Sequence, residues 1–197
     1  MNRKRSTSLL DSGRIFIWGE INEESAEQFI KDIRYVMLKN ITSVYVYIHS
    51  EGGDVDSACA IIDEIEGAKL QKVRVHTIGI GKAYSCAAFI LCMGSKGYRY
   101  TTKNTGVMLH PMHYELPSDY VDAHRSFTEF STRQYLSIIT NVAKACGNKT
   151  KKDINAFIAS VKDGLWLTCS EATDTGVTDG EWDYRWEKEI DEEARNR

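Results

Sequence analysis

A serine, Ser85, lies where an expected strand gives way to an expected helix of small apolar residues. A hydroxyl at such a turn stands outside the sheet and can act as a nucleophile. The backbone N–H groups in the first turn of a helix lack partners within it, so the N–H of Cys86 can stabilise an oxyanion. Serine is also a preferred helix N-cap, and at this single position that structural role is the more common one.

Two consecutive glycines, Gly52 and Gly53, separate another expected strand from its following helix. Glycine reaches positive φ without a steric penalty and allows a second backbone to approach closely. The N–H of Gly53 can therefore serve as a second oxyanion donor, and extended substrate can pair along this segment. A plain tight turn explains the two glycines equally simply.

The candidate base is His110, which follows the apolar run Val107-Met108-Leu109 and precedes Pro111. A histidine at the exit of a buried strand lies at the edge of the sheet, where a base for Ser85 is needed; a partly buried structural histidine is the alternative. His113 is a rival, but residues three apart on an extended chain point to opposite faces.

A serine and histidine pair needs a carboxylate that orients the imidazole and stabilises its cation. Asp163 follows an expected helix over 154–161 and lies in a turn beside Gly164, so it is the predicted acid. Other aspartates nearby are better explained as helix caps or surface charges: Asp153, Asp174 and Asp179.

The elements that position these residues follow from the apolar patterns. Runs rich in β-branched and aromatic residues predict strands at 14–18, 43–49, 73–80, 98–101 and 107–110. Helices are predicted to begin at Asn22, at Asp54 and at about Ser85, the last ending near Met93. Strands separated by such helices imply right-handed crossovers, hence an α/β fold with a mostly parallel sheet.

The second half of the chain has a different pattern. A long helix is predicted from 119 to 146, with Gly147 as its stop. It carries more apolar surface than one small domain needs, so part of it is expected to pack against another subunit. Two capping boxes, Thr150-x-x-Asp153 and Thr168-x-x-Glu171, predict two further short helices.

Composition limits the class of protein. The 197 residues suit one domain, and a net charge of −3 provides no field that attracts nucleic acid or anionic lipid. The five cysteines are odd in number and form no C-x-x-C pair, which favours free thiols over structural zinc. The longest apolar run, 86–93, is too short to cross a bilayer, and no signal peptide is recognisable. We expect a cytoplasmic protein without membrane association, metal or cofactor.

Five motifs in one order resemble the proteolytic subunit of the Clp protease, from about Ser8 to Asp179. They are an opening strand (R-I-F-I-W-G-E, 14–20), a strand with a Gly-Gly turn (Y-I-H-S-E-G-G-D-V, 47–55), a nucleophile segment (G-K-A-Y-S-C-A-A-F, 81–89), a base segment (V-M-L-H-P, 107–111) and a closing helix (W-L-T-x-x-E-A and G-V-x-D, 166–179). Several motifs in the right order are far more specific than any one of them.

The resemblance implies a serine endopeptidase that cleaves unfolded proteins or peptides, with Ser85 as nucleophile and His110 as base. It implies an oxyanion hole from the N–H groups of Gly53 and Cys86. It also implies a crotonase-like α/β fold with a projecting handle helix. A single domain over 1–197 would then comprise an N-terminal segment (1–13), a handle (112–146) and a charged C-terminal segment (180–197). The implied partners are other copies, in stacked heptameric rings, and an AAA+ unfoldase.

The chain departs from the family pattern in four places. Pro111 follows the histidine directly, the segment Met112–Ser118 lacks the run of glycines, and one extra residue separates Asp163 from Trp166. About a dozen residues precede Arg14, and a hairpin that gates a pore takes at least about ten. We therefore expect an ungated or weakly gated pore, with coupling to an unfoldase that is reduced, specialised or absent.

Two alternatives stay open on the sequence. A crotonase-type acyl-CoA enzyme also uses two backbone N–H groups to hold an oxyanion, but it does not need the pair Ser85 and His110. A non-catalytic ring subunit would only assemble with an active partner. A fluorophosphonate probe separates them, because it should label Ser85 only in a peptidase.

Overall fold

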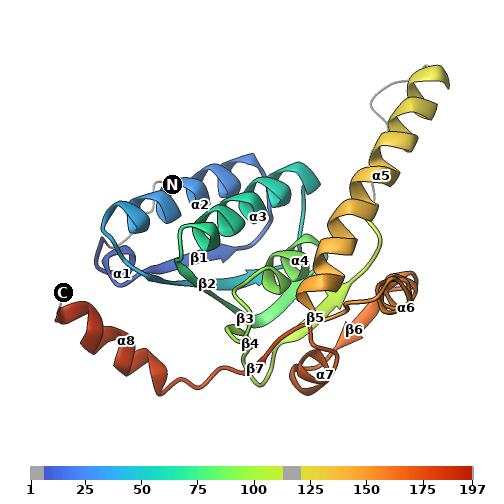
Figure 1. Ribbon diagram of the computed structural model, residues 1–197. Helices are drawn as coiled ribbons and strands as arrows, with labels where there is room; N and C mark the ends of the chain where they lie inside the picture. The colour runs from blue at the N-terminus through green and yellow to red at the C-terminus, as the bar shows by residue number, and fades with distance from the viewer. Residues whose placement is uncertain (1–6, 113–120, 197) are drawn as a thin grey trace.

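The computed structural model describes residues 7–112 and 121–196, and within them the chain folds as an α/β structure. Figure 1 labels its elements. The strands are β1 (Arg14–Trp18), β2 (Ser43–Ser50), β3 (Arg74–Tyr84), β4 (Arg99–Thr101), β5 (Gly106–Leu109), β6 (Leu165–Leu167) and β7 (Gly180–Glu181). The helices are α1 (Thr7–Asp11), α2 (Glu23–Leu38), α3 (Val55–Leu70), α4 (Cys86–Cys92), α5 (Val121–Ala145), α6 (Lys151–Val161), α7 (Cys169–Asp174) and α8 (Trp186–Arg195).

The strands of the described residues form one sheet in the order β1-β2-β3-β4-β7, with β5 and β6 branching from β3. All pairings are parallel except that of β5 with β6. The predicted mostly parallel sheet is therefore confirmed. The branch arises because residues 77–79 of β3 pair with β4, whereas residues 82–84 pair with β5.

Helix caps hold the crossovers as the sequence predicts. Asn22 caps α2 and accepts a hydrogen bond from the Ser25 N–H, and Asp54 caps α3. The capping boxes at Thr150 and Thr168 are both present, at the starts of α6 and α7. Because each cap satisfies N–H groups that the helix itself leaves unpaired, the start of each helix is specified locally.

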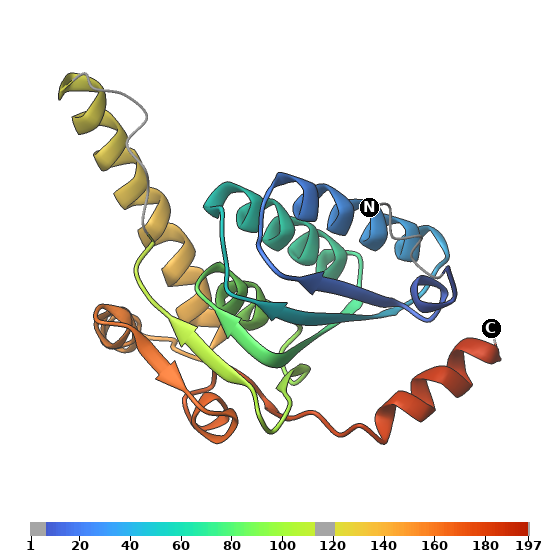
Figure 2. The same ribbon diagram turned by 180° about the vertical axis from the view of Figure 1, so that it is seen from behind.

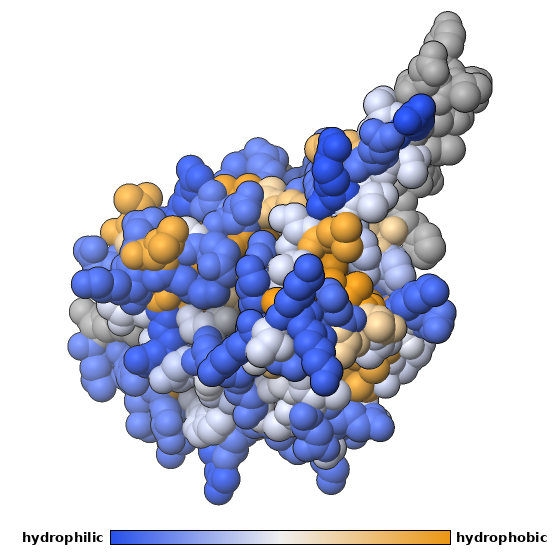
Figure 3. Space-filling model, turned by 45° about the vertical axis from the view of Figure 1, so that its right-hand side comes forward, coloured by the Kyte–Doolittle hydropathy of each residue, from blue (hydrophilic) through white to orange (hydrophobic). Residues whose placement is uncertain are grey.

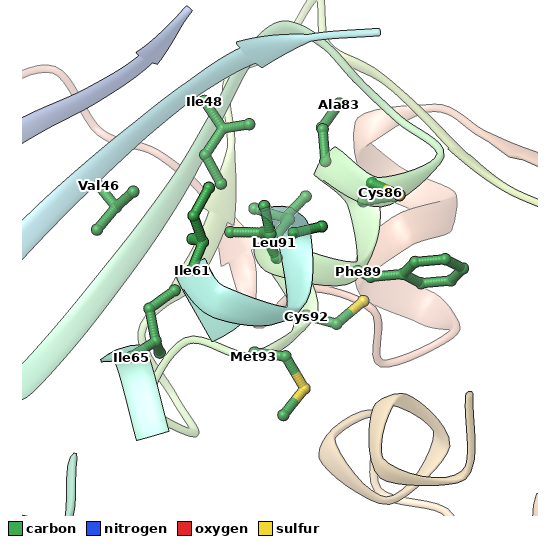
Figure 4. Packing of buried hydrophobic residues seen from close by; sticks show 14 of the residues in the cluster. Val46, Ile48, Ile61, Ile65, Ala83, Cys86, Phe89, Leu91, Cys92 and Met93 are labelled. Carbon is green, nitrogen blue, oxygen red and sulfur yellow. The ribbon is translucent and has the colours of Figure 1, made fainter. Parts of the chain in front are cut away.

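The main core lies between the sheet and helices α2, α3 and α4, which cover one of its faces (Figures 1 and 2). Figure 4 shows how its side chains meet: Val46 and Ile48 of β2 lie near Ile61 and Ile65 of α3, and Leu91 of α4 lies beside Ile61. This packing anchors α4, so the segment just before it is held rigidly against the end of β3.

One strand is longer than its sequence pattern predicts. The sequence pattern predicts that this strand ends at Ile80, but β3 continues through Gly81 to Tyr84. Gly81 adopts φ 71°, its N–H donates to Thr105 Oγ1 at 3.0 Å, and the register with β2 shifts between Ile48 and Ser50. The chain thus changes partner from β4 to β5 without ending, which brings Ser85 to the carboxyl end of the extended strand.

Asp179 is not a helix cap or a surface charge, so that interpretation was wrong. Its carboxylate accepts two hydrogen bonds from the fully buried Arg99 guanidinium, at 2.8 and 2.7 Å, and one from the Gly97 N–H. Burial opposes ionisation of the carboxyl, but the hydrogen bonds and charge of Arg99 outweigh it and lower the pKa of Asp179 to about 2. This ion pair joins β4 to the segment before β7.

A second cluster of apolar side chains lies on the sheet face opposite α2 and α3, beneath α8 (Figures 1 and 2). Its buried members are Tyr45, Tyr47, Ile78, Trp182 and Ile190. Glu187 of α8 accepts hydrogen bonds from Arg14, from the Tyr47 hydroxyl and from the Trp182 indole. The charged C-terminal segment is therefore attached to the sheet by aromatic packing and by the carboxylates of Glu187 and Asp191, which both pair with Arg14.

The long helix is confirmed as α5, which projects from the body of the molecule in both ribbon views (Figures 1 and 2). Phe130 and Leu136 on this helix are about half exposed, at 51% and 45%. No helix in the described ranges is both long and apolar enough to span a bilayer. His113 and nearly all of the segment 112–118 lie outside the described residues.

Candidate active site

Ser85 and His110 lie in contact at the carboxyl ends of β3 and β5. The Ser85 Oγ is 2.8 Å from the His110 Nε2. Ser85 directly precedes α4, yet its side chain makes no capping hydrogen bond to that helix. The hydroxyl is therefore directed at the imidazole, and a simple N-cap role does not describe it.

The backbone at Ser85 is strained. Its φ is 55° and its ψ is −127°, outside the regions that side-chain-bearing residues favour. Such conformations cost on the order of 1–3 kcal/mol and persist where surrounding structure imposes them. Here the Ser85 N–H donates to the Met108 carbonyl at 2.8 Å, and the buried helix α4 follows at once. The strain turns the hydroxyl toward β5.

The Gly52-Gly53 turn packs directly against the nucleophile segment. A Cβ at Gly52 would lie 2.7 Å from the Ser85 Cβ and 3.1 Å from the Cys86 nitrogen, and one at Gly53 would lie 2.1 Å from the Ile21 carbonyl oxygen. Both glycines also have positive φ, 102° and 149°. No other residue fits at either position, because both contacts are shorter than real Cβ contacts allow.

Two backbone donors beside Ser85 are unused. Gly52 O accepts from the Ile21 N–H, and the Asp54 N–H donates to Ile21 O, so the bridge to Ile21 bypasses the N–H of Gly53. Among the described residues, neither this N–H nor that of Cys86 donates to a backbone carbonyl. Gly53 is exposed, so its N–H is accessible to a ligand, and two such donors at one serine suit an anion-binding role.

Two supporting side chains, the Ser50 hydroxyl and the Cys86 thiol, are not identifiable from the sequence as parts of the site. The Ser50 hydroxyl is fully buried and accepts from the Gly52 N–H at 3.0 Å, which holds the turn. The Cys86 thiol donates to the Gly53 carbonyl at 3.4 Å. The only signal for Ser50 is a small polar residue at the end of an apolar strand next to the two glycines.

The pairing of β5 with β6 brings the backbone of Asp163 near His110, but no hydrogen bond joins their side chains. The antiparallel pairing of Leu165 with Leu109 places Gly164 opposite His110 and Asp163 one residue beyond. Asp163 is exposed, and no hydrogen bond joins it to His110 in the described residues. The structure thus brings together Ser85, His110 and the two backbone donors. The predicted acid, Asp163, lies nearby but is not hydrogen-bonded to His110.

The surface around the pair is partly aromatic. Register places Tyr84, Met108 and Trp166 side by side on three neighbouring strands. The Tyr84 and Trp166 rings meet edge to face at 5.3 Å, and Trp166 is 63% exposed. Within the described ranges, no cluster of three histidine, cysteine or acidic side chains is placed to hold a metal ion.

The sequence was compared with the models of known protein families. The model of the Clp protease family matches residues 2–182, nearly the whole chain. The chain belongs to the Clp protease family. The predicted crotonase-like α/β fold is thereby confirmed, in agreement with the sheet and helices described above.

Curated relatives cover most of the chain at modest identity. An ATP-dependent Clp protease proteolytic subunit of Carsonella ruddii is 26% identical over 91% of this chain and 89% of its own length. A proteolytic subunit 2 of Treponema denticola is 27% identical over 85% of this chain and 80% of its own. A proteolytic subunit 1 of Bacillus cereus is 25% identical over 87% of this chain and 86% of its own length.

Proposed function

We propose that this chain is a serine endopeptidase in which Ser85 is the nucleophile and His110 the general base. The observation that carries the proposal is the 2.8 Å contact between Ser85 Oγ and His110 Nε2, next to two unused backbone donors. Family membership supports a proteolytic role. The substrates that we propose are unfolded proteins or peptides, because an extended chain can pair along the segment that contains Gly52 and Gly53.

Each group has a defined task in the proposed reaction. His110 takes the proton from Ser85 as the hydroxyl oxygen attacks the peptide carbonyl. The N–H groups of Gly53 and Cys86 stabilise the negative charge on the carbonyl oxygen. His110 then gives the proton to the departing amine, and water hydrolyses the ester left on Ser85 by the same steps.

Asp163 is the acid that we propose for the triad. Its backbone lies one residue beyond the position opposite His110, and Gly164 between them adopts φ 88°. A glycine tolerates a change of φ that other residues do not, so rotation at Gly164 carries the carboxylate toward the imidazole. The carboxylate would then stabilise the imidazolium that forms during the reaction.

Several copies of the chain are proposed to assemble into stacked rings. The half-exposed Phe130 and Leu136 lie on α5, and Figure 3 shows apolar surface where this helix leaves the body. A groove between α3 and α5 is lined by apolar side chains, among them Ile62, Phe130 and Ile138, and by charged ones such as Asp63 and Arg133. Exposed apolar side chains with polar ones around them mark interfaces. The relatives are named as subunits of an ATP-dependent protease, which supports a partner that uses ATP. We propose that this partner is the AAA+ unfoldase that the family resemblance implies, with coupling that is reduced or specialised.

A fluorophosphonate probe combined with sedimentation tests this proposal. The purified protein should hydrolyse short unstructured peptides, become labelled at Ser85 and sediment well above 22.3 kDa at micromolar concentration. A non-catalytic ring subunit would sediment as an oligomer without labelling, and an acyl-CoA enzyme would also stay unlabelled. Either result contradicts the peptidase proposal, and a mass of one chain contradicts the assembly.

A further inference from the structure

The thiol of Cys86 makes a contact that the proposed reaction does not use. Cys86 is 1% exposed, and its Sγ lies 3.4 Å from the carbonyl oxygen of Gly53. Figure 4 shows the side chain beside Ala83, on the inner side of the nucleophile segment. Burial raises the pKa of this thiol, so it stays protonated at neutral pH and can donate a hydrogen bond.

The Gly53 carbonyl has no other donor among the described residues. The peptide group before Gly53 is held because its carbonyl, on Gly52, accepts from Ile21 N–H. The peptide group after it is held at its N–H, on Asp54, by Ile21 O. The thiol completes this arrangement. Together with the ion pair between Lys82 and Glu51, it links the glycine turn to the segment that carries Ser85.

The same residue therefore contributes to the proposed oxyanion hole in two ways. The backbone N–H of Cys86 is one of the two donors, and its thiol holds the residue that bears the other. The Gly53 N–H belongs to the planar peptide group that Ile21 already orients through the Gly52 carbonyl. The thiol holds the next peptide group, so it limits the freedom of the glycine between the two groups and fixes the distance of Gly53 from Cys86. We infer that the Cys86 side chain is a positioning residue that fixes the spacing between the two oxyanion donors.

This inference rests on the proposed function, and its test separates the two. Cys86→Ala removes the thiol, Cys86→Ser retains a donor, and Cys92→Ala is the matched control. Cys92 is also fully buried on α4, but its thiol does not contact the glycine turn. All three variants are compared with the wild-type protein in its assembled form.

The first readout is peptide hydrolysis. Cys86→Ala should lower kcat about three- to thirtyfold, less than the 10²–10³-fold typical of deleting an oxyanion donor. KM should change by less than about twofold, because the interaction strengthens only in the transition state. Cys86→Ser should recover most of the loss, and Cys92→Ala should stay close to wild type. An equal loss in Cys92→Ala, or none in Cys86→Ala, would overturn the inference.

The second readout does not depend on activity. Amide hydrogen exchange of a fragment covering residues 50–56 should become at least about fivefold faster in Cys86→Ala and stay unchanged in Cys92→Ala, since local openings report local contacts. Unchanged exchange in Cys86→Ala would refute the positioning role. If the wild-type protein has no peptidase activity but exchange is still faster in Cys86→Ala than in wild type, the result supports the positioning role while refuting the proposed function.

Discussion

Two polar sites at strand ends of this sheet are built on opposite principles. At Arg99 and Asp179 the fully buried guanidinium binds the half-buried carboxylate and the Ala145 carbonyl, and the carboxylate also accepts from backbone N–H groups. At Ser85 the backbone is strained, and two adjacent N–H groups have no partner in the described residues. The first arrangement is complete in the folded chain, whereas the second is complete only with a bound oxyanion.

The difference separates a structural role from a functional one by geometry alone. A group whose hydrogen bonds are all formed within the chain stabilises the fold and has nothing left to offer a ligand. Backbone strain of the kind at Ser85 costs stability, so it is expected where it serves another purpose. Mutations should therefore separate the two regions. Substitutions at the Ser85 site should change activity without changing stability, and substitutions at the pair of Arg99 and Asp179 should change stability first.

The largest effect is expected at Ser85. Ser85→Ala should lower kcat for a fluorogenic peptide by about 10⁴–10⁶-fold, because the nucleophile is lost while the oxyanion donors remain. The midpoint of urea unfolding should change little, since the hydroxyl caps no helix. An exposed serine on α7, Ser170→Ala, serves as control. Wild-type turnover in Ser85→Ala would contradict its assignment as the nucleophile.

Asp163→Asn should have the next largest effect on turnover. An amide cannot stabilise the imidazolium, so kcat should fall by about 10²–10⁴-fold while sedimentation of the assembly stays unchanged. The matched variant is Asp174→Asn, at the end of α7. A near-normal kcat in Asp163→Asn together with an inactive Asp174→Asn would contradict this assignment and identify Asp174 as the acid.

The sequence predicts the parts of the fold and site that depend on neighbouring residues. Strand β2 is a continuous apolar and aromatic run, and the caps at Asn22 and Thr168 act within one helical turn. Ser85 and His110 are also recognisable, because the carboxyl ends of neighbouring parallel strands meet at one edge of the sheet. Such features need no knowledge of distant contacts.

The features that the sequence does not reveal depend on residues far apart in the chain. Arg99 and Asp179 are separated by 80 positions, and nothing near Asp179 indicates a buried partner. The extension of β3 beyond Gly81 requires the hydroxyl of Thr105 and a new partner strand. The contact between the Cys86 thiol and Gly53 likewise exists only after the glycine turn has docked.

Asp179→Asn tests the structural role of the ion pair between Arg99 and Asp179. It leaves the fully buried Arg99 without its charge partner, and breaking a buried pair costs about 3–5 kcal/mol in the free energy of unfolding. Because the pKa of Asp179 is lowered to about 2, its contribution is present above about pH 4 and is lost as the pH falls toward 2. The deficit of the variant should therefore shrink in acid.

Urea unfolding at fixed protein concentration measures this deficit, since assembly also contributes to stability. Asp183→Asn is the control, because Asp183 forms its ion pair with the exposed Arg185. The control should have little effect. A loss of activity in Asp179→Asn under conditions where the variant remains fully folded would contradict the purely structural role.

The smallest effect is expected from His76, on the sheet face covered by α8. Its ring lies 4.4 Å from the Tyr45 ring and 4.7 Å from the Tyr98 ring, and neither of its nitrogens has a hydrogen-bond partner in the described residues. Burial, with a smaller contribution from the charge of Arg74, lowers the pKa of His76 to about 4. The folded chain thus keeps this imidazole neutral where the unfolded chain protonates it.

A depressed histidine pKa destabilises the fold in acid, because between about pH 6.5 and pH 4 the unfolded chain binds the extra proton. His76→Phe removes that proton site while keeping a ring in the cluster. Its free energy of unfolding should therefore fall less than that of the wild type between pH 7 and pH 5. Tyr98→Phe, which retains the histidine, should keep the wild-type slope. Equal slopes in His76→Phe and wild type would show that this imidazole does not titrate differently in the two states, and that the aromatic face contributes packing alone.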